Sequence, residues 1–195
     1  MAQFLRVLLE RKMFDDIIYI IGQALGIVAV ILGLLCFQMK NAKGILVFQI
    51  TIASVFALHY LCLGAYTAVA VNVLAAFQNV CYYFRNKKGS RSLLLPIIFT
   101  SLVVVVSLLT WDSWQCIFLM TGVAVGAVSL ALSSAQNIRF AMFIKCPLCL
   151  IYNALVFSVG GVLYESASLL SSVIGTVKYY SDKKKTLMQG EKKNG

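Results

Sequence analysis

Residues 17–37 read IIYIIGQALGIVAVILGLLCF, an uninterrupted run of 21 residues without a charged side chain. A helix of about 20 apolar residues is long enough to cross the hydrocarbon core of a bilayer. The run is too long for the apolar core of a signal peptide, and Glu10, Asp15 and Asp16 precede it. We therefore expect it to be a retained first membrane span.

The composition extends this expectation to the rest of the chain. Hydrophobic residues make up 61% of the 195 positions and charged residues 12%, whereas soluble domains carry about 25% charged residues. The net charge of +10 falls mostly in short runs between apolar stretches, which is the pattern of membrane proteins. An ordinary cytosolic enzyme and a nucleic-acid-binding protein are therefore excluded, and the length leaves room for about seven spans.

Seven apolar segments are predicted to cross the membrane. They cover residues 17–37, 45–63, 66–84, 93–111, 114–132, 142–157 and 162–180. The connections alternate between basic loops, at 38–44, 86–92 and 133–141, and uncharged or acidic turns, at 64–65, 112–113 and 158–161. The six cysteines lie within the apolar segments and do not suggest an extracellular disulfide framework.

The distribution of positive charge predicts the orientation. The amino-terminal tail holds three of the 17 Lys and Arg residues, and the other fourteen fall on the opposite side of the membrane. The positive-inside rule then puts the amino terminus outside and the carboxyl terminus in the cytoplasm. Residues 1–16 are expected to form either an interfacial helix or a frayed extracytoplasmic tail. Residues 181–195 are expected to be a disordered basic cytoplasmic tail near anionic lipid.

Residues 17–84 and 114–180 resemble each other, with 93–111 as a connector. Gly22-x-x-x-Gly26 opens the first half and Gly122-x-x-x-Gly126 the second, and these pairs usually indicate close helix packing. His59 and Asn153 each lie late in a second span and are taken as equivalents. The predicted fold is an all-α polytopic membrane protein with seven transmembrane helices in a 3+1+3 arrangement, two parallel three-helix repeats and a connector helix.

Short motifs in this order resemble the YgjV-type family of bacterial inner-membrane proteins. They are Gln23-x-x-Gly26, Leu32-Gly33, His59 with Leu63-Gly64-Ala65-Tyr66, Asn72, and Ile151-Tyr152-Asn153 through Gly160-Gly161 to Glu165. The resemblance covers residues 17–182 and implies the bacterial plasma (inner) membrane. Its layout is in turn similar to the SWEET sugar transporters and the PnuC vitamin-precursor transporters. SWEET-type proteins typically carry a Pro-Gln pair that kinks each half, whereas neither Pro96 nor Pro147 precedes Gln, so the resemblance does not extend to the residues of their hinge.

Glu165 is the most informative polar residue because it lies within a span, where a charge is costly. At helical spacing it shares a stripe with Ser168, Ser172 and Thr176. One interpretation is a cavity wall with Glu165 as a substrate ligand or proton site. The alternative is a structural hydrogen bond close to the turn at Gly160–Gly161.

Three asparagines and the single histidine complete the candidate site. Asn72 and Asn79 share a face of the third span, and Asn153 lies on the sixth with Cys149 and Lys145 on the same face. They either line a site or hydrogen-bond neighbouring helices. His59 is either a neutral structural histidine or a proton-coupling group. Lys145 is expected near the cytoplasmic end of its span, reaching the interface.

The leading hypothesis is a small-molecule transporter or facilitator, with alternating access to a central site. The substrate-binding residues are predicted to be Asn72, Asn79, Asn153, Glu165 and His59, with Tyr60, Tyr152 or Tyr164 for stacking. Transport is expected to be either facilitated diffusion or coupled to protons through Glu165 or His59. The solute is expected to be polar and neutral or cationic, and the other partner is the lipid bilayer; homo-oligomerisation is left open. The alternative is a non-transporting receptor, scaffold or lipid-binding subunit. No cofactor, metal site or catalytic group is predicted.

Overall fold

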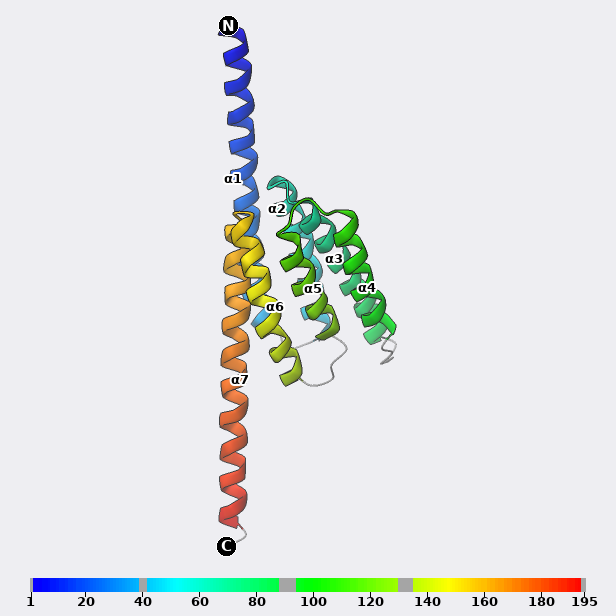
Figure 1. Ribbon diagram of the computed structural model, residues 1–195. Coiled ribbons are helices and arrows are strands. Elements are labelled where there is room, and N and C mark those ends of the chain that lie inside the picture. The colour runs from blue at the N-terminus through cyan, green and yellow to red at the C-terminus, as the bar shows by residue number, and fades with distance from the viewer. Residues whose placement is uncertain (1, 39–41, 88–93, 130–134, 194–195) are drawn as a thin grey trace.

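The computed structural model describes residues 2–38, 42–87, 94–129 and 135–193, and side chains for 15–36, 44–85, 94–129 and 139–181. The described residues form seven α-helices and no strand (Figure 1). The helices are α1 Ala2–Gln38, α2 Ala42–Cys62, α3 Tyr66–Lys87, α4 Leu94–Leu109, α5 Cys116–Ser129, α6 Ala135–Leu155 and α7 Val159–Lys193. Among the described residues, each predicted span overlaps a helix of its own. Most of the basic side chains that predict the orientation lie outside the described residues.

The first and last helices are longer than the predicted spans. α1 has 37 residues and begins at Ala2, so residues 2–16 continue the first span as helix. α7 has 35 residues and reaches Lys193, so the expectation of a disordered tail from residue 181 is wrong up to that position. Extending an existing helix is far easier than nucleating a new one, and neither extension contains proline.

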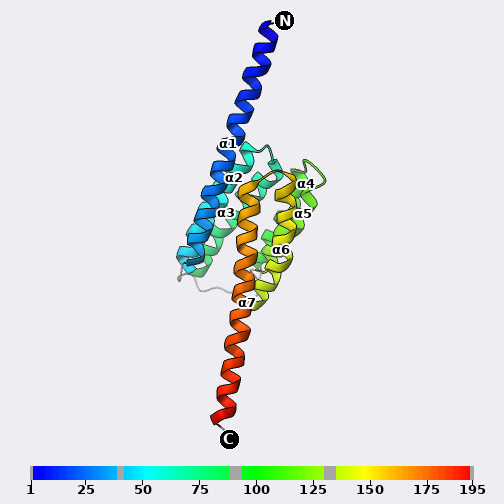
Figure 2. The same ribbon diagram turned by 90° about the vertical axis from the view of Figure 1, so that its left-hand side faces the viewer.

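The helices form a ring that runs up and down in chain order. Each helix packs against the next one in the sequence, and α7 packs against α1 to close the ring. The two views show the long helices α1 and α7 projecting from opposite ends of the bundle (Figures 1 and 2). Because the number of helices is odd, the two chain termini lie at opposite ends.

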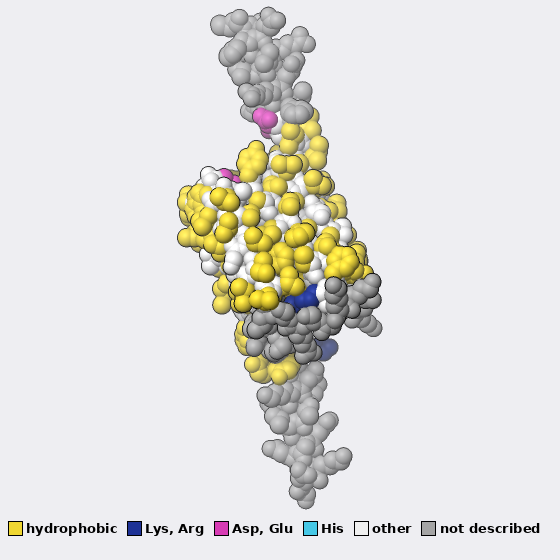
Figure 3. All heavy atoms as spheres, turned by 90° about the vertical axis from the view of Figure 1, so that its right-hand side faces the viewer, with side chains coloured by type: hydrophobic (Ala, Val, Ile, Leu, Met, Phe, Trp, Pro, Cys, Tyr) yellow, Lys and Arg dark blue, Asp and Glu magenta, His cyan; other side chains and the backbone are white. Residues whose placement is uncertain are grey.

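The outside of the ring is apolar. Large hydrophobic side chains such as Ile20, Leu109 and Ile174 are 65%, 80% and 67% exposed. Figure 3 shows hydrophobic side chains covering much of one face, with acidic groups toward the amino-terminal end and basic groups toward the other. Contiguous apolar surface of this extent is untypical of a soluble monomer. Three segments are long and apolar enough to cross a membrane, Asp15–Cys36, Gly44–Cys62 and Tyr66–Arg85. The fold is that of an all-α membrane protein.

Glycine brings α1 and α7 into close contact. A Cβ atom on Gly160 would lie 2.4 Å from the Cα of Gly26, so the two backbones touch where the helices cross. Beside this crossing, the Gln23 amide donates to the carbonyl of Phe157 at 2.7 Å and accepts from the N–H of Val159 at 3.1 Å. The first helix thereby fixes the turn between α6 and α7.

Candidate functional site

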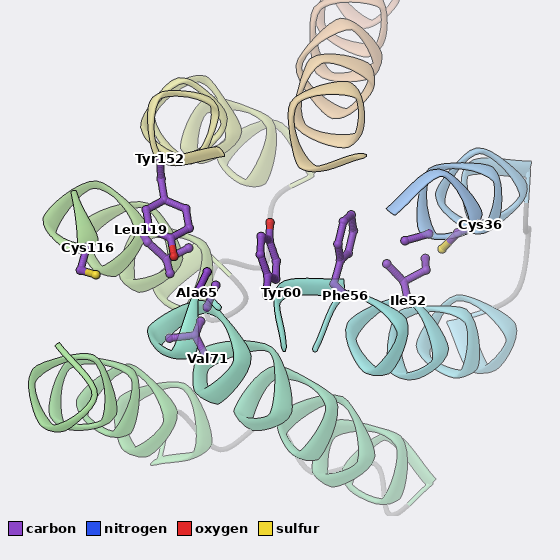
Figure 4. Close-up of a cluster of buried hydrophobic side chains, with 11 residues drawn as sticks. Cys36, Ile52, Phe56, Tyr60, Ala65, Val71, Cys116, Leu119 and Tyr152 are labelled. Carbon is purple, nitrogen blue, oxygen red and sulfur yellow. The ribbon is translucent and has the colours of Figure 1, made fainter. Parts of the chain in front are cut away.

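A polar cavity lies inside the ring, and its volume is about 220 Å³. It is lined from five helices, α2, α3, α5, α6 and α7, whereas α1 and α4 contribute no lining residue. Figure 4 looks along the bundle and shows Phe56 and Tyr60 of α2 pointing into the middle of the ring. The cavity extends from Gln49 and Met142, in the first half of α2 and α6, to the ends of these helices at Tyr60 and Asn153.

The backbone of α6 and α7 repeats that of α2 and α3. Adding 93 to the bounds of α2 gives those of α6, and the same step takes the start of α3 to the start of α7. The connecting turns share their hydrogen bonds as well. Ala65 N–H donates to the carbonyl of Tyr60 at 3.0 Å, and Ser158 N–H donates to that of Asn153 at 2.9 Å. These are the six-to-one bonds that end a helix in a Schellman motif.

Residues that line the cavity follow this repeat. Six pairs of lining residues are 93 positions apart: Gln49 and Met142, Ile52 and Lys145, Phe56 and Cys149, Tyr60 and Asn153, Val71 and Tyr164, and Asn72 and Glu165. The members of one pair also touch, because the Tyr60 hydroxyl donates to Asn153 Oδ1 at 2.6 Å. Equivalent residues of two halves can meet only near the axis that relates them. The cavity therefore lies on the pseudo-two-fold axis of the repeat.

The repeat corrects the register expected from the sequence. His59 and Asn153 were paired there, but the turns and helix ends align His59 with Tyr152 and Tyr60 with Asn153. The expected pairing relied on residue polarity, and it is wrong by one position. A shift of one residue turns a helix by about 100°, which moves a side chain from the cavity to the helix interface.

An ion pair lies at the cavity wall. Lys145 Nζ is 3.4 Å from Glu165 Oε1, and the side chains are 21% and 9% exposed. The expectation that Lys145 reaches the cytoplasmic interface is therefore wrong. Lys145 is the central residue of α6, and a Cβ atom on Gly126 would lie 3.1 Å from Lys145 Cδ. The absence of a side chain at Gly126 leaves room for the lysine stem inside the bundle.

Glu165 keeps one oxygen without a partner. Oε1 faces Lys145, whereas Oε2 is buried and has no hydrogen bond. Nearly all buried polar atoms in proteins are hydrogen-bonded, so a buried carboxylate oxygen that lacks a partner is unusual. Within the stripe predicted on α7, Glu165 lines the cavity, while Ser172 Oγ bonds instead to the carbonyl of Ser168.

Amide side chains surround the same space. Asn72, Asn79 and Asn153 line the cavity. Asn72 Nδ2 donates to the carbonyl of Ala68 at 2.9 Å, one turn earlier. Gln78, also in the lining, is 6% exposed, and its Nε2 has no hydrogen-bond partner. The cavity thus offers both donors and acceptors that the protein leaves unsatisfied.

His59 lies outside the lining. It is completely buried, with Nδ1 2.7 Å from the carbonyl of Gly22 and Nε2 2.6 Å from Ser158 Oγ. Since a carbonyl can only accept, Nδ1 carries a proton, and in the neutral imidazole Nε2 then accepts from the Ser158 hydroxyl. Ser158 Oγ accepts in turn from the N–H of Gly161 at 3.0 Å. This network joins α1, α2 and the turn before α7, and both nitrogens of a neutral imidazole are used.

Sequence reasoning missed two features of the lining. Lys145 was placed on one helix face with Cys149 and Asn153, and that spacing already pointed it toward the cavity. Its position as a lone cation inside an apolar segment was the signal. Phe56 gave no signal, because an aromatic residue is ordinary in an apolar helix, and Gln49 was not singled out in the sequence. Tyr60 and Tyr164 are in the lining, whereas Tyr152 is not.

The ring of apolar helices around a polar cavity defines a polytopic α-helical membrane protein with an internal repeat. The model of the Imp-YgjV family, described as bacterial inner membrane protein, matches residues 20–183. The chain belongs to this family. No curated protein and no solved structure matches the chain, so the comparisons do not show the expected similarity to SWEET and PnuC transporters.

Proposed function

We propose that the protein carries a small polar solute across the bacterial inner membrane. The observation that supports this most directly is the polar cavity on the pseudo-two-fold axis, with the Lys145–Glu165 ion pair in its wall. Transporters built from parallel repeats hold their substrates at the repeat interface. Charged side chains within a bilayer are rare and mark substrate or ion pathways. The proposal assigns no catalytic step and no cofactor to the protein.

The Tyr60–Asn153 hydrogen bond is proposed to close one end of the cavity. Both residues lie in the last turns of their helices, next to the α2–α3 and α6–α7 turns. Each comes from a different half of the repeat, so separating the halves at this end breaks the bond. Alternating access then consists of opening this end while the other end closes.

The proposed orientation puts these turns outside and the carboxyl end of α7 in the cytoplasm. It is supported by thirteen of the fourteen cations that the sequence assigns to the carboxyl-terminal side, since Lys145 lies inside the bundle. A green fluorescent protein fused after Gly195 is expected to fluoresce, and alkaline phosphatase fused there is expected to be inactive. An active phosphatase fusion at that position contradicts the orientation.

The function is tested with the purified protein in two steps. First, sugars, nucleosides, amines and amino acids are screened for thermal stabilisation, since a ligand stabilises the native state in proportion to its occupancy. Second, each stabilising solute is offered to proteoliposomes in radiolabelled form. Uptake above that of empty liposomes, lost in Asn72→Ala, supports transport. Stabilisation without uptake identifies the receptor or scaffold alternative instead.

The same vesicles test proton coupling. Of the two groups that the sequence proposed, Glu165 lines the cavity, whereas both His59 nitrogens are engaged in the helix interface. Uptake that depends on an inward proton gradient in the wild type, and becomes independent of it in the double variant Lys145→Met/Glu165→Gln, which leaves no unpaired charge, identifies the Lys145–Glu165 pair as the coupling site. Gradient-independent uptake in both proteins identifies facilitated diffusion.

A further inference from the structure

The two walls of the cavity carry different chemistry at equivalent positions. The charged wall, on α6 and α7, presents Lys145 and Glu165. The neutral wall, on α2 and α3, presents Ile52 and Asn72 at the positions 93 residues earlier. Phe56 extends the neutral wall and stacks on Tyr60, with ring centroids 5.8 Å apart. A solute in this cavity meets both charges on one side, and on the other the apolar side chains of Ile52 and Phe56 next to uncharged amide groups.

The ion pair retains capacity to bind. Its separation of 3.4 Å exceeds the roughly 2.7–2.9 Å of a charge-assisted hydrogen bond. Glu165 Oε2 has no hydrogen-bond partner. The ammonium group of Lys145 carries three N–H donors, and Glu165 Oε1 does not occupy all of them. A solute that supplies a cation to the carboxylate and an anion to the lysine gives each group a better partner than it has now.

Charge balance restricts what can enter. Burying a charge without a partner is expensive in a low-dielectric interior. The pair is neutral as a whole, so a solute with a single net charge adds an unbalanced charge to the cavity. A zwitterion adds none, because its two ends pair with Lys145 and Glu165 in exchange for their mutual contact.

We propose that the solute is a small zwitterion with an apolar side chain, an amino acid or a compound of the same charge pattern. Its ammonium group binds Glu165, its carboxylate binds Lys145, and its side chain packs against Ile52 and Phe56. The volume of about 220 Å³ is below the roughly 300–1,000 Å³ of pockets for drug-sized ligands, which suits a molecule of this size. This inference rests on the proposed function, because it names the substrate class of the same cavity.

Three leucine compounds test the charge pattern at nearly constant shape. Leucine is a zwitterion, leucinamide keeps only the cation and N-acetylleucine keeps only the anion; glucose is the uncharged polar control. Binding to the purified protein is measured from thermal stabilisation over a concentration series, with alanine, valine and phenylalanine to cover side-chain size. We expect the best zwitterion to bind about tenfold more tightly, or about 1.4 kcal/mol, than its singly charged derivatives.

The double variant Lys145→Met/Glu165→Gln removes both charges and keeps the cavity neutral. It is expected to lose the preference for the zwitterion. Ser172→Ala, on α7 but outside the lining, is expected to keep that preference. If leucinamide or glucose binds as well as the best zwitterion, or if no zwitterion binds, the inference is wrong. The proposed function fails separately, when none of the wider set of solutes enters proteoliposomes.

Discussion

The two halves of the repeat have nearly the same backbone and different cavity chemistry. α2 and α6 have equal lengths, and most backbone hydrogen bonds of the turn after α2 recur at the equivalent residues after α6. Yet Ile52 and Asn72 in the first half correspond to Lys145 and Glu165 in the second. The turn residue Gly64 corresponds to Phe157, and Thr67 to Gly160. The comparison shows that the same backbone accommodates different side chains at equivalent positions. A substitution in one half can therefore be compared with the equivalent position in the other half.

The largest effect is expected from removing one member of the ion pair. Lys145→Met leaves Glu165 buried without a counter-charge, and Glu165→Gln leaves Lys145 in the same state, so each is expected to lose about 3–5 kcal/mol of stability. The double variant is expected to regain most of this loss. Ile52→Met, the corresponding change in the neutral half, is expected to cost less than about 1.5 kcal/mol. Thermal or denaturant unfolding in detergent measures all four; additive losses in the double variant contradict the pairing.

Gly160→Ala tests the close contact between α7 and α1, at a position where the two halves of the repeat differ. The new methyl group would press on the backbone of Gly26, and overpacking of this kind costs about 1–3 kcal/mol. The equivalent position in the first half holds Thr67, whose hydroxyl donates to the carbonyl of Thr110. Val159→Ala, at a neighbouring residue that is half exposed, is the control. A melting temperature that changes equally in both variants is inconsistent with the close crossing.

Tyr60→Phe tests whether the hydrogen bond between Tyr60 and Asn153 holds the two halves together at the proposed closed end. The change removes the donor to Asn153 Oδ1 and leaves a buried acceptor, which costs about 1–3 kcal/mol. Tyr66→Phe, at a residue that is 61% exposed, controls for the loss of a hydroxyl. Unfolding gives the stability, and accessibility of Cys149 to a thiol reagent reports opening of the cavity. Unchanged labelling of Cys149 rules out a role of this bond in closure.

The smallest effect is expected in the turns. Phe157 has φ of 53° and Gly64 has φ of 71°, a left-handed conformation that costs a residue with a side chain about 1–2 kcal/mol. Phe157→Gly is therefore expected to stabilise the protein by up to about 1 kcal/mol, since glycine also loses more chain entropy. Gly64→Ala is expected to destabilise it by a similar amount. If both substitutions destabilise the protein, the prediction is wrong: the contacts of the Phe157 ring then contribute more stability than the left-handed backbone costs.

More of the fold than of the candidate site could be predicted from the sequence. Apolar runs and loops predict seven helices because lipid requires each span to satisfy its own backbone hydrogen bonds. The repeat was visible through glycines and turns, but its register depended on backbone bonds at Tyr60 and Asn153 that side-chain polarity does not reveal. His59 shows the same limit: its polarity suggested the cavity, and its partners proved to be Gly22 and Ser158. Contacts between distant segments decide such roles, and spacing along the chain does not fix them.

The Lys145–Glu165 pair also bears on how the chain enters the membrane. Each group lies within its helix, and a lone Lys or Asp at the centre of an inserting helix costs about 2.5–3.5 kcal/mol. α6 and α7 are joined by a short turn and pack against each other, so Lys145 and Glu165 can pass the translocon as a neutral ion pair within one hairpin. The first two helices carry no such pair within their apolar segments and can insert one at a time. Biogenesis of the second half is thus expected to be cooperative, and truncation after α6 is expected to leave that helix poorly inserted.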